Sequence, residues 1–163
     1  KCRATTHHLH YPEHLFKRFP DAVVIQTHRH PVEVIPSYGS MMAALASPFT
    51  NHLDPIAMAQ HWAQKWRSGL ARTRAFRDSG FDDRYFDLWF KDSVSDPEKT
   101  IEGIYNFTGQ TLTEVAMREM ARWREMNARE DRPEHHYNLS DYGFTSVGIE
   151  RQFADYISRH VEK

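Results

Sequence analysis

The chain has 163 residues, of which 40% are hydrophobic and 26% are charged, so it carries enough apolar side chains for a sizeable core. This composition excludes an intrinsically disordered protein. Because 21 Lys and Arg balance 22 Asp and Glu, no basic surface field favours nucleic acid or an acidic membrane as a partner. The longest apolar runs are far too short for a membrane helix, and a single cysteine, Cys2, excludes an internal disulfide.

These properties predict one soluble domain over residues 1–163. The single cysteine and the lack of a charged-then-apolar leader favour the cytoplasm as its location. Because the sequence begins at Lys1 rather than at Met, we also expect its natural N-terminus to lie upstream.

The first half of the chain predicts three helices and one strand. A short helix is expected over residues 12–19, where apolar side chains share one helical face. Residues 22–27 are apolar and β-branched without polar alternation, which is typical of a parallel strand covered on both faces by helices. A helix is expected from Pro31, and the longest helix should run from an N-cap at Asp54 to Gly80.

The second half predicts one further strand followed by helices. Residues 84–90 mix aromatic and apolar side chains between polar turns, which indicates a strand. An Asp-Pro pair opens a helix over residues 97–109, Thr113 caps another, and Ser146 opens the last one. The alternation of strands with helices predicts an α/β fold with a parallel sheet, flanked by more helix than strand.

The passage from the first strand to the next helix, residues 23–37, is the most informative segment. Ligands bind at the carboxyl ends of strands in open α/β sheets, where the next helix offers free N–H groups. Arg29 lies at this junction, and its planar guanidinium suits phosphate or sulfate. Ser37 follows about two helical turns later and is able to donate its hydroxyl to the same anion. Spacing alone favours a plainer alternative, in which Arg29 pairs with a carboxylate and Ser37 is an ordinary helix serine.

Three segments, in order along the chain, resemble motifs of the PAPS-dependent sulfotransferase family. Residues 29–31 (Arg-His-Pro), with Ser37, resemble the segment that binds the 3'-phosphate of the donor. Residues 90–97 and 104–109 resemble the family's Tyr-Glu-Asp-Leu stretch, the Asp-Pro that follows it, and a helix that ends in Phe-x-Gly. Residues 136–144 are similar to a C-terminal signature of a bacterial branch. The resemblance implies a helix-rich α/β fold with a partial P-loop-like parallel sheet.

The sequence also departs from the family pattern. The Gly/Ser/Thr-rich loop that holds the 5'-phosphosulfate does not occur in these residues. The family's lysine falls at Ala4, with Lys1 the only nearby substitute. His30 replaces the acid that commonly follows the arginine, and Phe90 replaces the tyrosine. We therefore interpret the chain as the C-terminal part of a sulfotransferase-like protein, either a fragment or a truncated relative.

The resemblance implies that the complete protein transfers a sulfuryl group from PAPS to a hydroxyl or amine of a small-molecule acceptor and releases adenosine 3',5'-bisphosphate. Arg29 and Ser37 would bind the 3'-phosphate. His8 is the expected base, because it matches the family's His-Leu pair and a neutral imidazole accepts a proton at cell pH. His7 is the runner-up, and the plain alternative is that either histidine is a polar turn residue.

Two other hypotheses stay open at this point. A chain without the phosphosulfate loop is expected to be inactive alone, so it is alternatively a non-catalytic module that binds a nucleotide 3'-phosphate. The third hypothesis is an interaction domain, in which an upstream segment or self-association covers an exposed part of the core.

The eleven histidines do not predict a metal site, although His28 and His30 could share a metal if they lie on one face of a strand. No third ligand has suitable spacing, so we predict no metal. Trp62 and Trp66, four residues apart, are expected in the core rather than in an acceptor site. The arginines of the long helix, Arg77 included, are expected on a solvated face.

Overall fold

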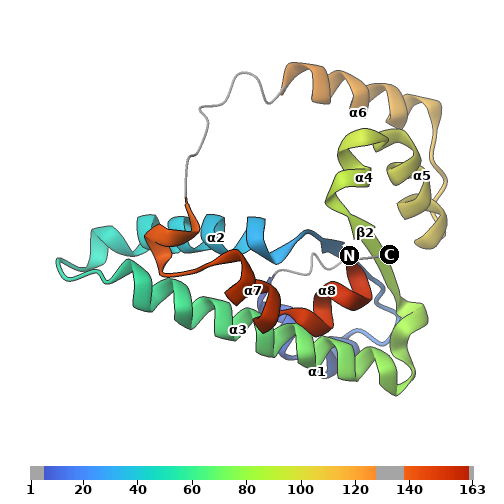
Figure 1. Cartoon of the computed structure of the whole chain (residues 1–163). Helices are drawn as coiled ribbons and strands as arrows, with labels where there is room; N and C mark the ends of the chain where they lie inside the picture. Colours follow the sequence, from blue (N-terminus) through green and yellow to red (C-terminus); the bar gives the residue numbers. More distant parts are fainter. Residues whose placement is uncertain (1–5, 128–137, 162–163) are drawn as a thin grey trace.

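The computed structural model describes residues 6–127 and 138–161, and side chains from His8 onwards. Helices dominate it, with two short strands between them (Figure 1). In chain order the elements, with η marking short turns of 3-10 or π helix, are η1 (Thr6–His10), α1 (Pro12–Arg18), β1 (Val24–His28), α2 (Pro31–Ala46), η2 (Ser47–Phe49), α3 (Pro55–Phe76), η3 (Arg77–Phe81), η4 (Asp82–Arg84), β2 (Tyr85–Trp89), α4 (Phe90–Ser95), α5 (Pro97–Phe107), α6 (Glu114–Met126), η6 (Leu139–Tyr142), α7 (Ser146–Gln152) and α8 (Ala154–His160).

Asp54 caps the longest helix, α3, as the sequence predicts. Its Oδ1 accepts two backbone N–H groups of the first turn, each at 3.0 Å. The regular helix ends at Phe76 rather than at Gly80, because η3 follows and Gly80 has a φ of 109°, which glycine adopts without steric cost. The cap predicted for α6 is confirmed, since Thr113 accepts the N–H of Ala116 at 3.2 Å.

Two parts of the secondary structure differ from the prediction. Phe90 begins α4 instead of ending a strand, and β2 stops at Trp89. The single helix predicted from Ser146 is two helices, because the backbone of Phe153 is not helical (φ -112°, ψ 17°) and its ring enters the core. After this break α8 reaches β2, where the indole N–H of Trp89 donates to the carbonyl of His160.

β1 and β2 form a parallel pair in which His28 lies opposite Trp89. The prediction of a helix-rich α/β fold with a parallel sheet is confirmed. The prediction that helices cover β1 on both faces is wrong for the part of the chain that the structure describes. The inward side chains are the polar Gln26 and His28, whereas Val23 and Ile25 on the alternate positions are 39% and 36% exposed. One side of β1 is therefore partly open.

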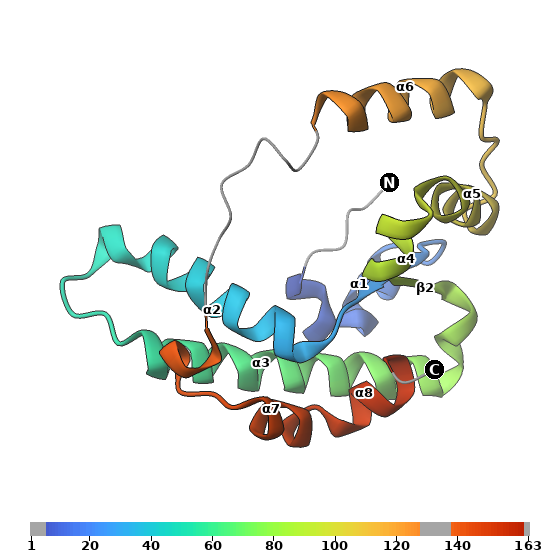
Figure 2. The same ribbon diagram turned by 45° about the horizontal axis from the view of Figure 1, so that its top comes forward.

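The main core lies between α2, α3, η6, α7 and α8. In Figure 2, α2 runs along one side of α3, and α7 and α8 run along another. A Cβ on Gly39 of α2 would lie only 3.1 Å from the Cβ of Ala59 of α3, so small residues allow the two helices to approach closely. The buried members of this cluster are Ile35, Ala59, Ala63, Phe144, Ile149, Phe153 and Ile157. A second cluster joins α1 to β2 through Leu15, Phe16 and Tyr85.

α4, α5 and α6 form an arm of the molecule, residues 90–127, that follows β2. None of the residues in these three helices is buried. Figure 1 shows α6 well away from α2 and α3. The arm contacts β2 through Phe86, whose ring centre lies 5.4 Å from that of Phe107 in α5. Among the helices of the described residues, none combines the length and the apolar character needed to cross a membrane.

Candidate functional site

Arg29 lies in the turn between β1 and α2, where the sequence places it. Its Nε donates to Oε2 of Glu33 at 2.6 Å, and its guanidinium carbon lies 4.4 Å from the centre of the Phe90 ring. The predicted pair with a carboxylate is therefore confirmed. Within residues 6–127 and 138–161, however, no group binds the two terminal nitrogens, and the side chain is 37% exposed. Arg29 thus still presents two donors to an anion, in a plane fixed by Glu33 and Phe90.

The start of α2 offers fewer free donors than the sequence predicts. Pro31 has no N–H, and the N–H of Val32 donates to Nδ1 of His30 at 3.3 Å. The N–H groups of Glu33 and Val34 both donate to the carbonyl of His30. The expectation of free N–H groups is therefore wrong for this first turn. His30, at the position of the family's acid, caps the helix as an acidic side chain commonly does.

Ser37 is half-buried on α2, one helical turn beyond Glu33. Among the described residues, no side-chain hydrogen bond joins Ser37 to Arg29. Glu33 is four residues from each of them, so it lies between the two along the helix. The joint role of Arg29 and Ser37 stays a prediction.

His8 and Arg29 border adjoining cavities. The cavity beside Arg29 has a volume of about 220 Å³ and mostly apolar walls, which include Val34, Ile35, Leu70, Phe90 and Phe153. The cavity beside His8 has a volume of about 180 Å³. Both are lined by Thr27, Trp66, Leu70 and Tyr156. The fold therefore brings the predicted base and the predicted anion-binding arginine to the same region, at the carboxyl end of β1.

A buried polar network lies beneath this region. The His28 side chain, 1% exposed, places its Nε2 2.8 Å from Oδ1 of Asp87 and its Nδ1 3.0 Å from the hydroxyl of Tyr156. Arg77 donates to both carboxylate oxygens of Asp87, at 2.6 and 2.8 Å. It also donates to Gln26 at 3.2 Å. β1, β2, α8 and the end of α3 therefore meet in one set of hydrogen bonds.

Burial and charge act in opposite directions on this network. Burial disfavours the charge of Asp87, but hydrogen bonds from Arg77 and His28 outweigh it and hold the pKa of that carboxyl far below its usual range. Burial likewise disfavours the charged form of Arg77, but the hydrogen bonds and negative charges of Asp87 and Asp82 favour it more strongly. The pKa of Arg77 is therefore raised. Burial raises the pKa of Tyr156 to about 12. Asp87 and Arg77 are thus an ion pair at neutral pH.

The geometry around His28 does not suit a metal ion. His28, Asp87 and His160 do place ligand-type atoms within 4.8 Å of one another. However, the two imidazoles are stacked, with centres 4.3 Å apart and planes inclined by 10°. A metal in the plane of one ring would lie above the plane of the other, so the lone pairs cannot converge. Nor do His28 and His30 share a ligand site, because His30 caps α2.

The residues of this network are not predicted from the sequence as a functional group. Arg77 was expected on a solvated face, but it is 4% exposed. Its position four residues after the buried Thr73 continues the inward face of α3, which is a signal for its burial. Asp87 stands out as a charge within an apolar strand. Trp66 does pack against the main core as predicted, although it also lines both cavities.

Several predicted positions lie outside the described residues. They are Lys1 and Ala4, the side chain of His7, and the segment 128–137, which contains the first residues of the C-terminal signature. Their roles stay predictions.

Residues 2–114 match the model of a sulfotransferase family, and this match covers more than half of the chain. The chain belongs to the sulfotransferase family. No curated protein matches its sequence.

Two solved structures resemble this sulfotransferase chain. Sulfotransferase STF9 from Mycobacterium avium matches 96% of the chain with a TM-score of 0.85 and 25% sequence identity. Sulfotransferase STF1 from Mycobacterium tuberculosis H37Rv matches 91% with a TM-score of 0.76 and 27% identity. The matches cover 40% and 37% of those two proteins, so the chain spans about two fifths of their length.

Proposed function

We propose that this sulfotransferase chain is the C-terminal, single-domain part that binds the 3'-phosphate of PAPS. In the whole protein it would take part in sulfuryl transfer to a hydroxyl or amine of a small-molecule acceptor. The setting of Arg29 carries the proposal, because its guanidinium is held in place while its two terminal nitrogens have no partner among the described residues. A cytoplasmic location stays a prediction from the sequence.

The adjoining cavities support a partial donor site. Pockets for whole ligands usually enclose about 300–1,000 Å³. The cavity at Arg29, about 220 Å³, is smaller, so it suits one end of a nucleotide rather than the whole donor. This agrees with a chain that spans about two fifths of the length of its structural relatives.

In the proposed reaction, the acceptor oxygen or nitrogen attacks the sulfur of PAPS. A new bond to sulfur forms, the bond from sulfur to the bridging phosphate oxygen breaks, and adenosine 3',5'-bisphosphate leaves. His8 takes the acceptor's proton. As in phosphoryl transfer, most of the catalysis is positioning and stabilisation of charge. Arg29, with Ser37, fixes the 3' end of the donor and thereby aligns the sulfur with the acceptor.

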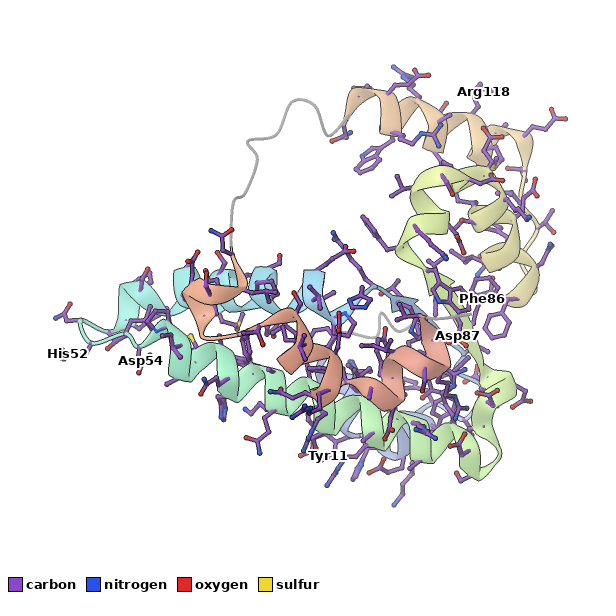
Figure 3. The ribbon with its side chains drawn as sticks, viewed as in Figure 1. Tyr11, His52, Asp54, Phe86, Asp87 and Arg118 are labelled. Carbon is purple, nitrogen blue, oxygen red and sulfur yellow. The ribbon has the colours of Figure 1, made fainter. Side chains whose placement is uncertain are left out.

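A nucleotide titration tests the donor end of the site. Arg29→Ala should weaken binding of adenosine 3',5'-bisphosphate by about 1.5 to 3 kcal/mol, the range for a hydrogen bond to a charged group, and Ser37→Ala should cost less. Arg118→Ala, on the exposed surface of α6 (Figure 3), is the matched control and should leave the affinity unchanged. If folded Arg29→Ala binds as tightly as the parent, the proposal is wrong.

The non-catalytic module is the second candidate, since no phosphosulfate loop occurs in this sequence. Loss of one preorganised hydrogen-bond donor commonly lowers turnover a hundredfold or more. The 163-residue chain should therefore show no turnover with PAPS and a panel of phenols, alcohols, sugars and amines. Release of adenosine 3',5'-bisphosphate that depends on an acceptor and disappears in His8→Ala would contradict this expectation.

An interaction role is the third candidate, favoured by the partly exposed Ile25 of β1 and Val23 just before it. Self-association, or an upstream segment, would cover them. Sedimentation of the 163-residue chain separates these outcomes, because a monomer at all concentrations excludes self-association.

A further inference from the structure

A line of hydrogen bonds runs from the buried ion pair to Tyr156 through His28, the residue that directly precedes Arg29. Arg77 holds Asp87, Asp87 lies 2.8 Å from Nε2 of His28, and Nδ1 of His28 lies 3.0 Å from the Tyr156 hydroxyl. His28 directly precedes Arg29 in the chain, and Tyr156 and Arg29 line the same cavity. Tyr156 of α8 thus fixes the residue next to Arg29 at the carboxyl end of β1.

The protons of this line can be assigned from its charged end. An ionised Asp87 only accepts hydrogen bonds, so Nε2 of His28 carries the proton that is shared with it. In the neutral imidazole Nδ1 is then an acceptor, and the Tyr156 hydroxyl donates to it. Each member therefore has a partner of the correct kind.

The line is held rigidly at its buried end. His160 stacks on one face of the His28 ring, and the ring centre of Trp89 lies 5.5 Å from that of His28. Trp89 also donates its indole N–H to the carbonyl of His160, which fixes α8 against β2. Arg77, 4% exposed, donates to Asp82 and to both carboxylate oxygens of Asp87. Movement of the Tyr156 hydroxyl is therefore restricted by groups from both strands.

We propose that Tyr156 and His28 are positioning residues for the 3'-phosphate site, which hold the backbone of Arg29 so that its guanidinium meets the phosphate. This inference rests on the proposed function. Neither side chain needs to touch the nucleotide. Without these two side chains the turn at Arg29 would be loose in the free protein. Ordering it when the phosphate binds would cost free energy and weaken the affinity.

Tyr156→Phe is the direct test, because it removes the hydroxyl and keeps the ring that lines both cavities. Affinity for adenosine 3',5'-bisphosphate should fall between about 3- and 10-fold, as expected for one hydrogen bond, while affinity for adenosine 5'-monophosphate stays unchanged. The matched control is Tyr142→Phe, since Tyr142 packs against the same core cluster. It should alter neither affinity.

A double-variant cycle separates positioning from a general loss of stability. If Tyr156 acts through Arg29, then Tyr156→Phe should have no further effect on bisphosphate affinity in an Arg29→Ala background. Amide hydrogen exchange gives a readout that needs no nucleotide. The Arg29 amide should exchange faster in Tyr156→Phe than in Tyr142→Phe.

Three outcomes decide whether Tyr156 and His28 position Arg29. Additive losses in the double variant, or an unchanged Arg29 amide, overturn the inference while the proposed function stands. A parent chain that binds both nucleotides equally overturns the proposed function, and the inference falls with it. Selective, non-additive loss with faster exchange supports the positioning role.

Discussion

The body formed by α2, α3, α7 and α8 closes a core, whereas the arm formed by α4, α5 and α6 does not. In the body, Ile149 is 0% exposed and Ala59 is 1% exposed. In the arm, Trp123 and Met126 of α6 are 64% and 71% exposed. Both regions consist of capped helices with apolar residues at helical spacing.

The difference shows what a helical pattern does and does not specify. Caps and spacing decide that a helix forms and which of its faces is apolar. Burial of that face depends on a second element, and in the body that element comes from a distant part of the sequence. Stability should therefore be concentrated in the body, and the predictions below test this by comparing changes in the body core with changes in the arm or in an exposed loop.

The largest contrast is expected for core truncation. Ile149→Ala should lower the free energy of unfolding by about 3 kcal/mol, because it removes buried methyl groups and leaves a cavity. Val115→Ala in α6, where the side chain is 57% exposed, should change it by no more than about 0.5 kcal/mol. Urea denaturation followed by circular dichroism measures both. Equal losses would mean that the arm is packed as tightly as the body.

Acid should weaken the body through His160. Burial lowers the pKa of His160 to about 4. The unfolded chain takes up this proton near pH 6.5, whereas the folded chain excludes it until about pH 4. Stability that is present at pH 7 is therefore lost as the pH falls towards 4, by about 2 kcal/mol at pH 5. The depressed pKa of Asp87 adds a loss only below the usual range of a carboxyl group.

Denaturation at pH 7 and pH 5 checks this expectation. His160→Phe should reduce the difference between the two values, while His52→Gln, in the exposed loop between α2 and α3 (Figure 3), should not. The arm contains no histidine, so its helices should be insensitive over this range. An unchanged difference in His160→Phe would assign the acid sensitivity to other groups.

The smallest contrast is expected at two helix caps. Asp54→Ala removes the acceptor for two N–H groups of α3 and should cost about 1 kcal/mol of global stability. Thr113→Ala removes the cap of α6 and should instead speed amide exchange within α6 alone. Hydrogen exchange resolved by residue distinguishes the two effects. Local opening of α3 in Asp54→Ala without any loss of global stability would show that α3 is not part of one cooperative unit.

Most of the fold could be predicted because its signals are local. Asp54 and Thr113 mark helix starts by side chains that act within one turn. The coverage of β1 could not be predicted, since an apolar run does not reveal which neighbours pack on it. In β1 the polar Gln26 and His28 face inwards because Arg77 and Asp87 satisfy them there.

The candidate site divides in the same way. Arg29 could be found from the end of a strand, the start of a helix and the family motif. Tyr156 could not be connected with it, because only the tertiary fold places α8 beside β1. From the sequence, pairing of Arg29 with a carboxylate is an alternative to anion binding. The pair with Glu33 uses only Nε, so it leaves the two terminal nitrogens available for the predicted anion.

The two side-chain partners of His28 have a consequence for the time course of folding. They lie 59 and 128 residues away along the chain. Helices form within about a microsecond, whereas contacts between distant segments come late, because closing the intervening loop costs entropy first. During synthesis the turn at Arg29 leaves the ribosome long before α8 does. Nucleotide affinity should therefore appear abruptly, when α8 docks, rather than grow with the length of the nascent chain.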